Sequence, residues 1–69
     1  MSALLDARER AGMSRSELAA KSGVGRESIR LYEVDGSEPR IDKAQRLARA
    51  LGTTVDALWP ADGPPEVRP

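Results

Sequence analysis

The sequence predicts a small all-α domain built from five short helices. Apolar residues recur at spacings of three and four, most regularly between Ile41 and Leu51. Residues that begin or end helices bracket each of these segments. The 69 residues are enough for one domain with a small core. We expect that domain to cover residues 1–59, and we expect the proline-rich residues 60–69 to form a disordered tail.

The first helix is predicted to run from Ser2, as N-cap, to Ala11, with Gly12 ending it. The helical spacing also predicts which side chains of this segment pack inward. It places Leu5 in a more exposed position. The residues expected on the core face are Leu4, Ala7 and Ala11.

The second helix is predicted to begin at Ser14 and to stop at Gly23. Ser14 and Glu17 have the spacing of a capping box, in which each side chain accepts a hydrogen bond from a backbone N–H of the first turn. Gly23 fits the left-handed conformation that often ends a helix. Leu18 and Ala19 should face inward, and the small Ala19 allows the next helix to cross closely.

The third helix is predicted over about residues 25–34, after Val24 fills the turn. Ile29 and Tyr32 give it one apolar stripe that should face the core. The second and third helices, with this turn, have the spacing of a helix-turn-helix. The residues predicted on its outer side are Glu27, Arg30, Leu31 and Val34, flanked by Arg26 and Ser28.

The fourth helix is predicted over Ile41–Leu51, followed by Gly52 as terminator. A last short helix should begin after Thr54, as N-cap, and stop before Pro60. The residues expected on the inner face of the fourth helix are Ile41, Ala44, Leu47, Ala48 and Leu51. The last helix adds three large apolar side chains, those of Val55, Leu58 and Trp59.

Composition excludes several classes of function. The chain has no Cys and no His, which rules out disulfides, thiol chemistry, zinc sites built on these residues and histidine-based catalysis. Neither a membrane span nor a signal peptide is recognisable, so we expect a soluble cytoplasmic protein without membrane contact. No catalytic constellation or cofactor motif appears, and we therefore expect no enzyme activity and no cofactor.

Charge is evenly balanced, with 11 basic and 11 acidic residues. Residues 1–50 carry ten basic against eight acidic residues, a net charge of +2, and residues 51–69 carry one against three, a net charge of −2. A modestly basic face on the helix-turn-helix side is compatible with DNA binding, although a single domain of this kind should bind phosphates weakly.

Three segments resemble the phage repressor and Cro class of helix-turn-helix domains, the XRE family. They are GMSRSELAAKSGVGRESIRLYE, the proline six residues after Glu33, and RLARALGTTVDALW. The resemblance covers about residues 2–59. It implies a compact five-helix, lambda-repressor-like DNA-binding domain from a prokaryotic or phage gene. In that family an arginine at the position of Arg8 pairs with the glutamate matching Glu33, so a structural ion pair is expected here.

The resemblance also implies which residues contact double-stranded DNA. The positions that match base-reading residues of the third helix are Arg26, Glu27, Arg30 and Leu31. The candidates for the DNA backbone are Arg15, Ser28, Ser37 and Arg40, the last of which could approach the minor groove. Arginine commonly reads guanine, glutamate can accept from cytosine, and leucine can pack on a thymine methyl group. An internal salt bridge between Glu27 and Arg30 is the alternative for that pair.

The function expected is that of a sequence-specific transcriptional regulator, dimeric on a palindromic operator. The possible dimer contacts are Val55, Leu58 and Trp59, although Trp59 could instead close the core. The family pattern is broken at Ser22, where an apolar residue is usual, at Gly25, which replaces a Ser or Thr cap, and in the acidic loop of Asp35 and Glu38. The alternative is a protein-interaction module with little DNA affinity, supported by the neutral net charge, the acidic loop and the outward Glu27, Leu31 and Val34. DNA binding is preferred, because four arginines are expected together on the side that faces DNA, namely Arg15, Arg26, Arg30 and Arg40.

Overall fold

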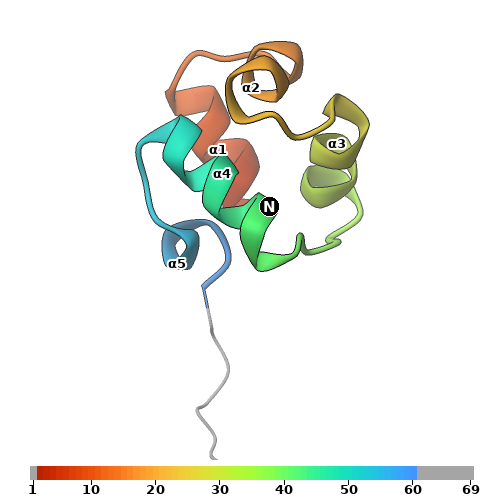
Figure 1. The fold of residues 1–69 in the computed structure, drawn as a ribbon, viewed down its shortest axis with the longest axis vertical. Coiled ribbons are helices and arrows are strands. Elements are labelled where there is room, and N and C mark those ends of the chain that lie inside the picture. Colours follow the sequence, from red (N-terminus) through yellow and green to blue (C-terminus); the bar gives the residue numbers. More distant parts are fainter. Residues whose placement is uncertain (1, 61–69) are drawn as a thin grey trace, which may run out of the picture.

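The fold is all-α, as predicted. In a computed structural model that describes residues 2–60, these residues form five α-helices and no strand (Figure 1). The helices are α1 (Ala3–Arg10), α2 (Arg15–Ser22), α3 (Arg26–Val34), α4 (Ile41–Leu51) and α5 (Val55–Leu58). Except for Pro60, the segment expected to form a tail lies outside the described residues.

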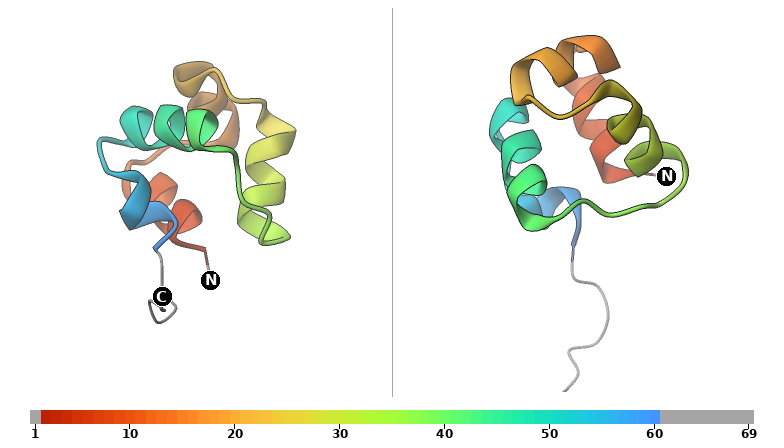
Figure 2. Two further views of the ribbon diagram at one scale, coloured as in Figure 1. Left: turned by 60° about the horizontal axis from the view of Figure 1, so that its bottom comes forward. Right: turned by 45° about the vertical axis from the view of Figure 1, so that its right-hand side comes forward.

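The helices surround one core. α2 contacts both α3 and α4, α1 contacts α3 and α5, and α4 also contacts α5. Figure 2 shows α2 and α5 at opposite ends of this arrangement, with α3 along one side. The first and last helices therefore meet, and α3 is held from one side while its other side remains uncovered.

Four leucine and isoleucine side chains fill the centre of the core. Leu4, Leu18, Ile29 and Leu47 are almost fully buried and come from α1, α2, α3 and α4 in turn. Val24, in the turn between α2 and α3, packs on the same cluster and is also buried. The turn of the helix-turn-helix is thus tied to the core by an apolar side chain as well as by its two helices.

The capping residues identified in the sequence begin and end the helices. The Ser14 Oγ accepts from the Glu17 N–H at 3.0 Å, and the Glu17 carboxylate accepts from the Ser14 N–H at 2.7 Å, which confirms the capping box. Gly23 ends α2 with a φ of 79°, in the left-handed region that favours glycine. Ser2 and Thr54 each accept one hydrogen bond at the start of α1 and α5.

Ser22 replaces an apolar residue without leaving its hydroxyl group unpaired. The residue is buried, and its Oγ accepts a hydrogen bond from the Val24 N–H at 3.1 Å. A buried hydroxyl group is tolerated when it has such a partner. The departure from the family pattern therefore adds a hydrogen bond within the turn in which Ser22 lies.

Two burial predictions were wrong. Ala11 is exposed, because α1 ends at Arg10 and Ala11 is its C-cap. Ile41 is 63% exposed, although helical spacing places it on the same stripe as Ala44. The stripe continues past the edge of the core, since Ala44 is buried whereas Ile41, the first residue of α4, remains at the surface. Ile41 instead lines a surface hollow of about 250 Å³ with Pro39, Val55 and Trp59 among its neighbours.

Candidate nucleic-acid interface

The outer side of α3 is a polar surface of the helix-turn-helix. Ile29 and Glu33 are buried on the inner side, whereas Arg26 and Glu27 are exposed and Arg30 is half-buried. Ser28 and Leu31 are half-buried as well. A helix of nine residues is about 13 Å long, so these side chains form one short strip.

The first turn of α3 has no side-chain cap. Gly25 is the N-cap and accepts no hydrogen bond through a side chain, in contrast to Ser14 at the start of α2. The first N–H groups of a helix need partners from outside the helix. Those of α3 are therefore left for water or for an anionic ligand.

A buried carboxylate joins α1, α2 and α3. Arg8 donates to Glu33 from Nε at 2.7 Å and from Nη2 at 3.0 Å. Arg15 donates to the same carboxylate from Nε at 2.9 Å. The Glu33 side chain is fully buried, and the Arg8 side chain is only 12% exposed. Arg8 also donates from Nη1 to the Met13 carbonyl oxygen at 2.9 Å, which ties it to the chain between α1 and α2.

Glu33 remains ionised in this setting. Burial opposes its charge, but the hydrogen bonds from Arg8 and Arg15 outweigh burial and hold the pKa of Glu33 below its ordinary value. The bond to Glu33 correspondingly raises the pKa of Arg8. The ion pair expected between Arg8 and Glu33 is thus present as a three-residue cluster, and the resemblance gave no sign of its third member, Arg15.

Arg15 consequently has two possible partners. Its Nε is bonded to Glu33, yet its side chain remains 32% exposed at the first residue of α2. Within the described residues, Glu33 is the one carboxylate within 4 Å of it. The bond to Glu33 uses only Nε, so the terminal guanidinium nitrogens are free to donate to another acceptor.

On the outer side of α3, Arg30 and Glu27 form an ion pair. Arg30 donates from Nε at 2.9 Å and also from Nη2, both to Oε2 of Glu27. The side chains are 42% and 71% exposed, respectively. The hydrogen bond from Arg30 lowers the pKa of Glu27, and the same bond raises the pKa of Arg30. The salt bridge considered as an alternative from the sequence is therefore present.

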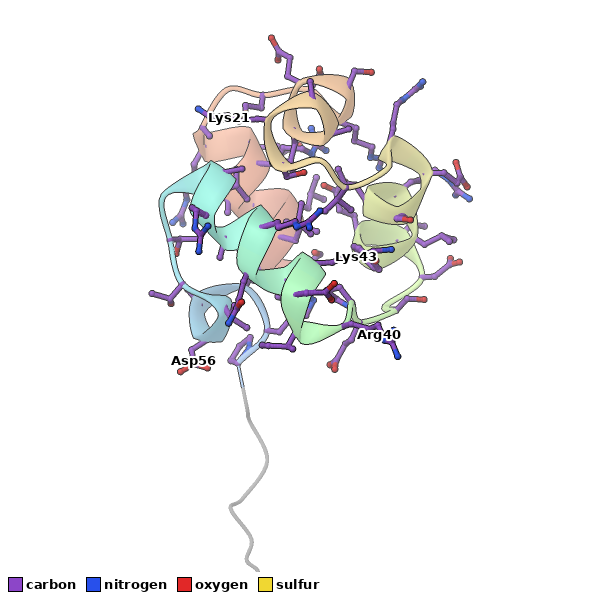
Figure 3. The ribbon with its side chains drawn as sticks, in the orientation of Figure 1. Lys21, Arg40, Lys43 and Asp56 are labelled. Carbon is purple, nitrogen blue, oxygen red and sulfur yellow. The ribbon has the colours of Figure 1, made fainter. Side chains whose placement is uncertain are left out.

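The other backbone candidates lie in the loop after α3. Ser37 and Arg40 are exposed, and Arg40 is the N-cap residue of α4. Figure 3 shows Arg40 at the start of α4, on the same side of the view as α3, whereas Lys21 lies on α2 at the upper left. The acidic residues Asp35 and Glu38 are exposed in the same loop as Ser37.

The edge proposed for a dimer differs from expectation. Leu58 is 3% exposed and belongs to the core, so it does not contribute to an exposed edge. Val55 and Trp59 are half-buried and pack against the core from outside. The Trp59 ring meets the Tyr32 ring edge to face, with centroids 6.4 Å apart. Trp59 thus closes one side of the core while keeping part of its surface accessible.

Within residues 2–60, no helix is long enough and apolar enough to cross a membrane. No group of three or more acidic side chains in the described part of the chain is placed to hold a metal ion.

A family model described as helix-turn-helix matches residues 4–58, which is most of the chain. No curated protein matches the chain significantly, and neither does any solved structure. The matched segment runs from the first core residue, Leu4, to the last, Leu58, and includes the complete helix-turn-helix of α2 and α3. The chain therefore belongs to the XRE-type helix-turn-helix family of DNA-binding regulators.

Proposed function

We propose that this protein is a sequence-specific transcriptional regulator of the repressor or Cro type, which inserts α3 into the major groove of operator DNA. The observation that carries the proposal is the two-sided character of α3. Its inner side is fixed in the core by Ile29 and Glu33, and its outer side displays hydrogen-bonding side chains. A recognition helix needs both properties, because base edges are read only by side chains held in register.

The roles of individual side chains follow from their placement and chemistry. Base contacts are assigned to Arg26, Glu27, Arg30 and Leu31 on α3. Backbone contacts are assigned to Arg15, Ser28, Ser37 and Arg40, which lie at the start of α2, on the flank of α3 and in the loop before α4. The cluster of Arg8, Arg15 and Glu33 supports both sets, because it holds the start of α2 against α3.

We further propose that two copies act together on an imperfect palindrome. The neutral net charge and the acidic loop reduce the attraction of one domain to phosphate. A dimer doubles the contacts and would place two α3 helices in half-sites about 34 Å apart. Ile41, Val55 and Trp59 surround an apolar surface hollow, which is a suitable contact for a second copy.

The DNA proposal is tested by selection from random duplex DNA at about 100 mM salt, followed by fluorescence anisotropy on the enriched sequence. We expect a palindromic sequence to be enriched. Arg15→Ala should weaken binding to all duplexes about equally, whereas Arg26→Ala should also alter the preferred bases. Lys21→Ala is the matched control, because this exposed cation borders a hollow that it shares with Arg46 and Arg49 of α4, and it should leave the preference unchanged.

The dimer is tested separately by sedimentation velocity with Ile41→Lys. Ile41 is largely exposed, so the substitution should preserve the fold while placing a charge in the apolar contact. We expect the variant to be monomeric at concentrations at which the natural protein is dimeric. Ala20→Lys, at an exposed position on α2, should have no effect on the oligomeric state. A monomeric natural protein would contradict the dimer but not the DNA contact.

The alternative function is a protein-interaction module on the same fold. It is favoured by two exposed apolar side chains, Val34 at 60% and Ile41 at 63%, and by the acidic loop between α3 and α4. If the selection enriches no sequence and all duplexes bind equally weakly, this alternative replaces the regulator.

A further inference from the structure

We infer that Glu27 is a positioning residue for Arg30, and that together they make one guanine of the operator half-site a required base. The inference rests on the proposed function, since it concerns how the same helix selects its DNA. It assigns to Glu27 a role different from reading a base directly. The discrimination supplied by Arg30 should therefore depend on the carboxylate next to it.

The hydrogen bonds of Arg30 leave one edge of its guanidinium group free. Nε and Nη2 form the side edge of the group, and both donate to Oε2 of Glu27. The end edge, formed by Nη1 and the second N–H of Nη2, has no bonded partner within the described residues. Guanine presents two adjacent acceptors, O6 and N7, in the major groove. The free edge of Arg30 matches these two acceptors, whereas adenine presents a donor in place of O6.

Glu27 can hold this edge in one direction because both residues stand on the same rigid helix. They are three residues apart and lie side by side on its outer face. Ile29 and Glu33, buried on the inner face, prevent α3 from rotating about its axis. An arginine side chain otherwise samples many rotamers, and ordering it opposes binding. The bond to the Glu27 carboxylate orders the Arg30 side chain before DNA binds, so less conformational entropy is lost on binding.

The pair also separates base recognition from attraction to phosphate. Arg30 with Glu27 has no net charge, so it adds little to non-specific binding. Arg26 and Arg15 also lower the pKa of Glu27, although less than Arg30 does, and the carboxylate therefore stays ionised at neutral pH. Without Glu27, Arg30 would be an isolated flexible cation that could bind any phosphate. Losing the carboxylate should then increase affinity for random DNA and decrease selectivity.

The test compares base preferences of four proteins by selection from the same random duplex library. They are the natural protein, Arg30→Ala, Glu27→Gln and Glu38→Gln. The last is the matched control: it removes one exposed carboxylate from the loop after α3 but has no bond to Arg30. Circular dichroism of each variant checks that the fold is intact. Binding constants are then measured by fluorescence anisotropy on the enriched duplex, on a duplex with that guanine replaced, and on a random duplex.

We expect Arg30→Ala and Glu27→Gln to lose the preference for guanine at the same position, each by about fivefold or more. Glu27→Gln should bind random duplex at least as tightly as the natural protein. Glu38→Gln should tighten binding to all duplexes while retaining the preference. Replacing the guanine by 7-deazaguanine, which lacks the N7 acceptor, should weaken the natural protein but have little effect on Glu27→Gln.

Two results would overturn the inference while leaving the proposed function intact. In the first, Glu27→Gln retains the guanine preference, which would show that Arg30 does not depend on a carboxylate beside it. In the second, it loses preference at a different position from Arg30→Ala, which would show that Glu27 reads a base itself. Failure of the natural protein to enrich any sequence would overturn the proposed function and this inference together.

Discussion

The two arginine–glutamate clusters of α3 have the same chemical groups in opposite surroundings. Glu33 is fully buried and receives hydrogen bonds from Arg8 and Arg15, which belong to two other helices. Glu27 is 71% exposed and receives its bonds from Arg30 on its own helix. The first cluster joins three helices, whereas the second changes nothing in how the helices pack. Burial and the origin of the partner therefore decide whether such a pair serves the fold or remains available to a ligand.

Removing the buried carboxylate should give the largest effect. Glu33→Ala leaves two arginines without their shared partner and should lower the free energy of unfolding by about 3 to 5 kcal/mol. A domain of this size has little more than that in total, so the variant should be largely unfolded. Urea titration at pH 7, followed by circular dichroism, measures the change. A loss below about 1 kcal/mol would mean that the cluster contributes little to the fold.

Removing one arginine should cost less, and unequally for the two. Arg8→Ala removes two bonds to Glu33 and one to the Met13 carbonyl oxygen, and we expect a loss of about 2 to 3 kcal/mol. Arg15→Ala removes one bond from a side chain that is about one-third exposed, so about 1 kcal/mol should be lost. The same urea titration ranks the variants. Equal losses of stability would contradict the expectation that Arg8 contributes more to the fold than Arg15.

The buried cluster should also make stability depend on acid pH. The pKa of Glu33 is lower in the folded protein than in the unfolded chain, so the unfolded chain binds more protons below its own pKa of about 4.3. The stabilisation is fully present above that pH and is lost as the pH falls through the folded pKa. Thermal unfolding between pH 7 and pH 2 should show this decrease. Arg15→Ala, which removes one cause of the shift, should show a smaller dependence.

The exposed pair should have the smallest effect on stability. Glu27→Gln removes the charge from a pair that is exposed to water and lies within one helix, so the urea midpoint should not change measurably. The same variant is expected to change the base preference, which makes the contrast with Glu33→Ala a direct test of the comparison. A clear loss of stability in Glu27→Gln would show that the outer pair also supports the fold.

Local chemistry explains why much of the fold could be predicted. The caps at Ser2, Ser14, Gly23 and Thr54 act through groups within a few residues of themselves, and the bounds of α4 follow from its own periodicity. The prediction failed where burial depends on distant elements. Ile41 has the spacing of a core residue, but it remains 63% exposed and only borders the surface hollow that it shares with Val55 and Trp59.

In the candidate site, too, some features could be predicted from local sequence and others depend on distant elements. Which residues of α3 face outward follows from helix geometry, and the pairing of Glu27 with Arg30 could be considered from their spacing alone. The bond between Arg15 and Glu33 could not be predicted from spacing, since 18 residues separate them and only the packing of α2 on α3 brings them together. The hydroxyl role of Ser22 depends likewise on the path of the turn.

The contact between α1 and α5 sets the order in which the domain can mature during its synthesis. Leu58 on α5 belongs to the same core as Leu4 on α1. A nascent chain arrested before Leu58 would therefore present α2 and α3 on an incomplete core. Full structure should appear only after that residue has left the ribosome, so that DNA binding begins at the completion of the domain rather than gradually during translation.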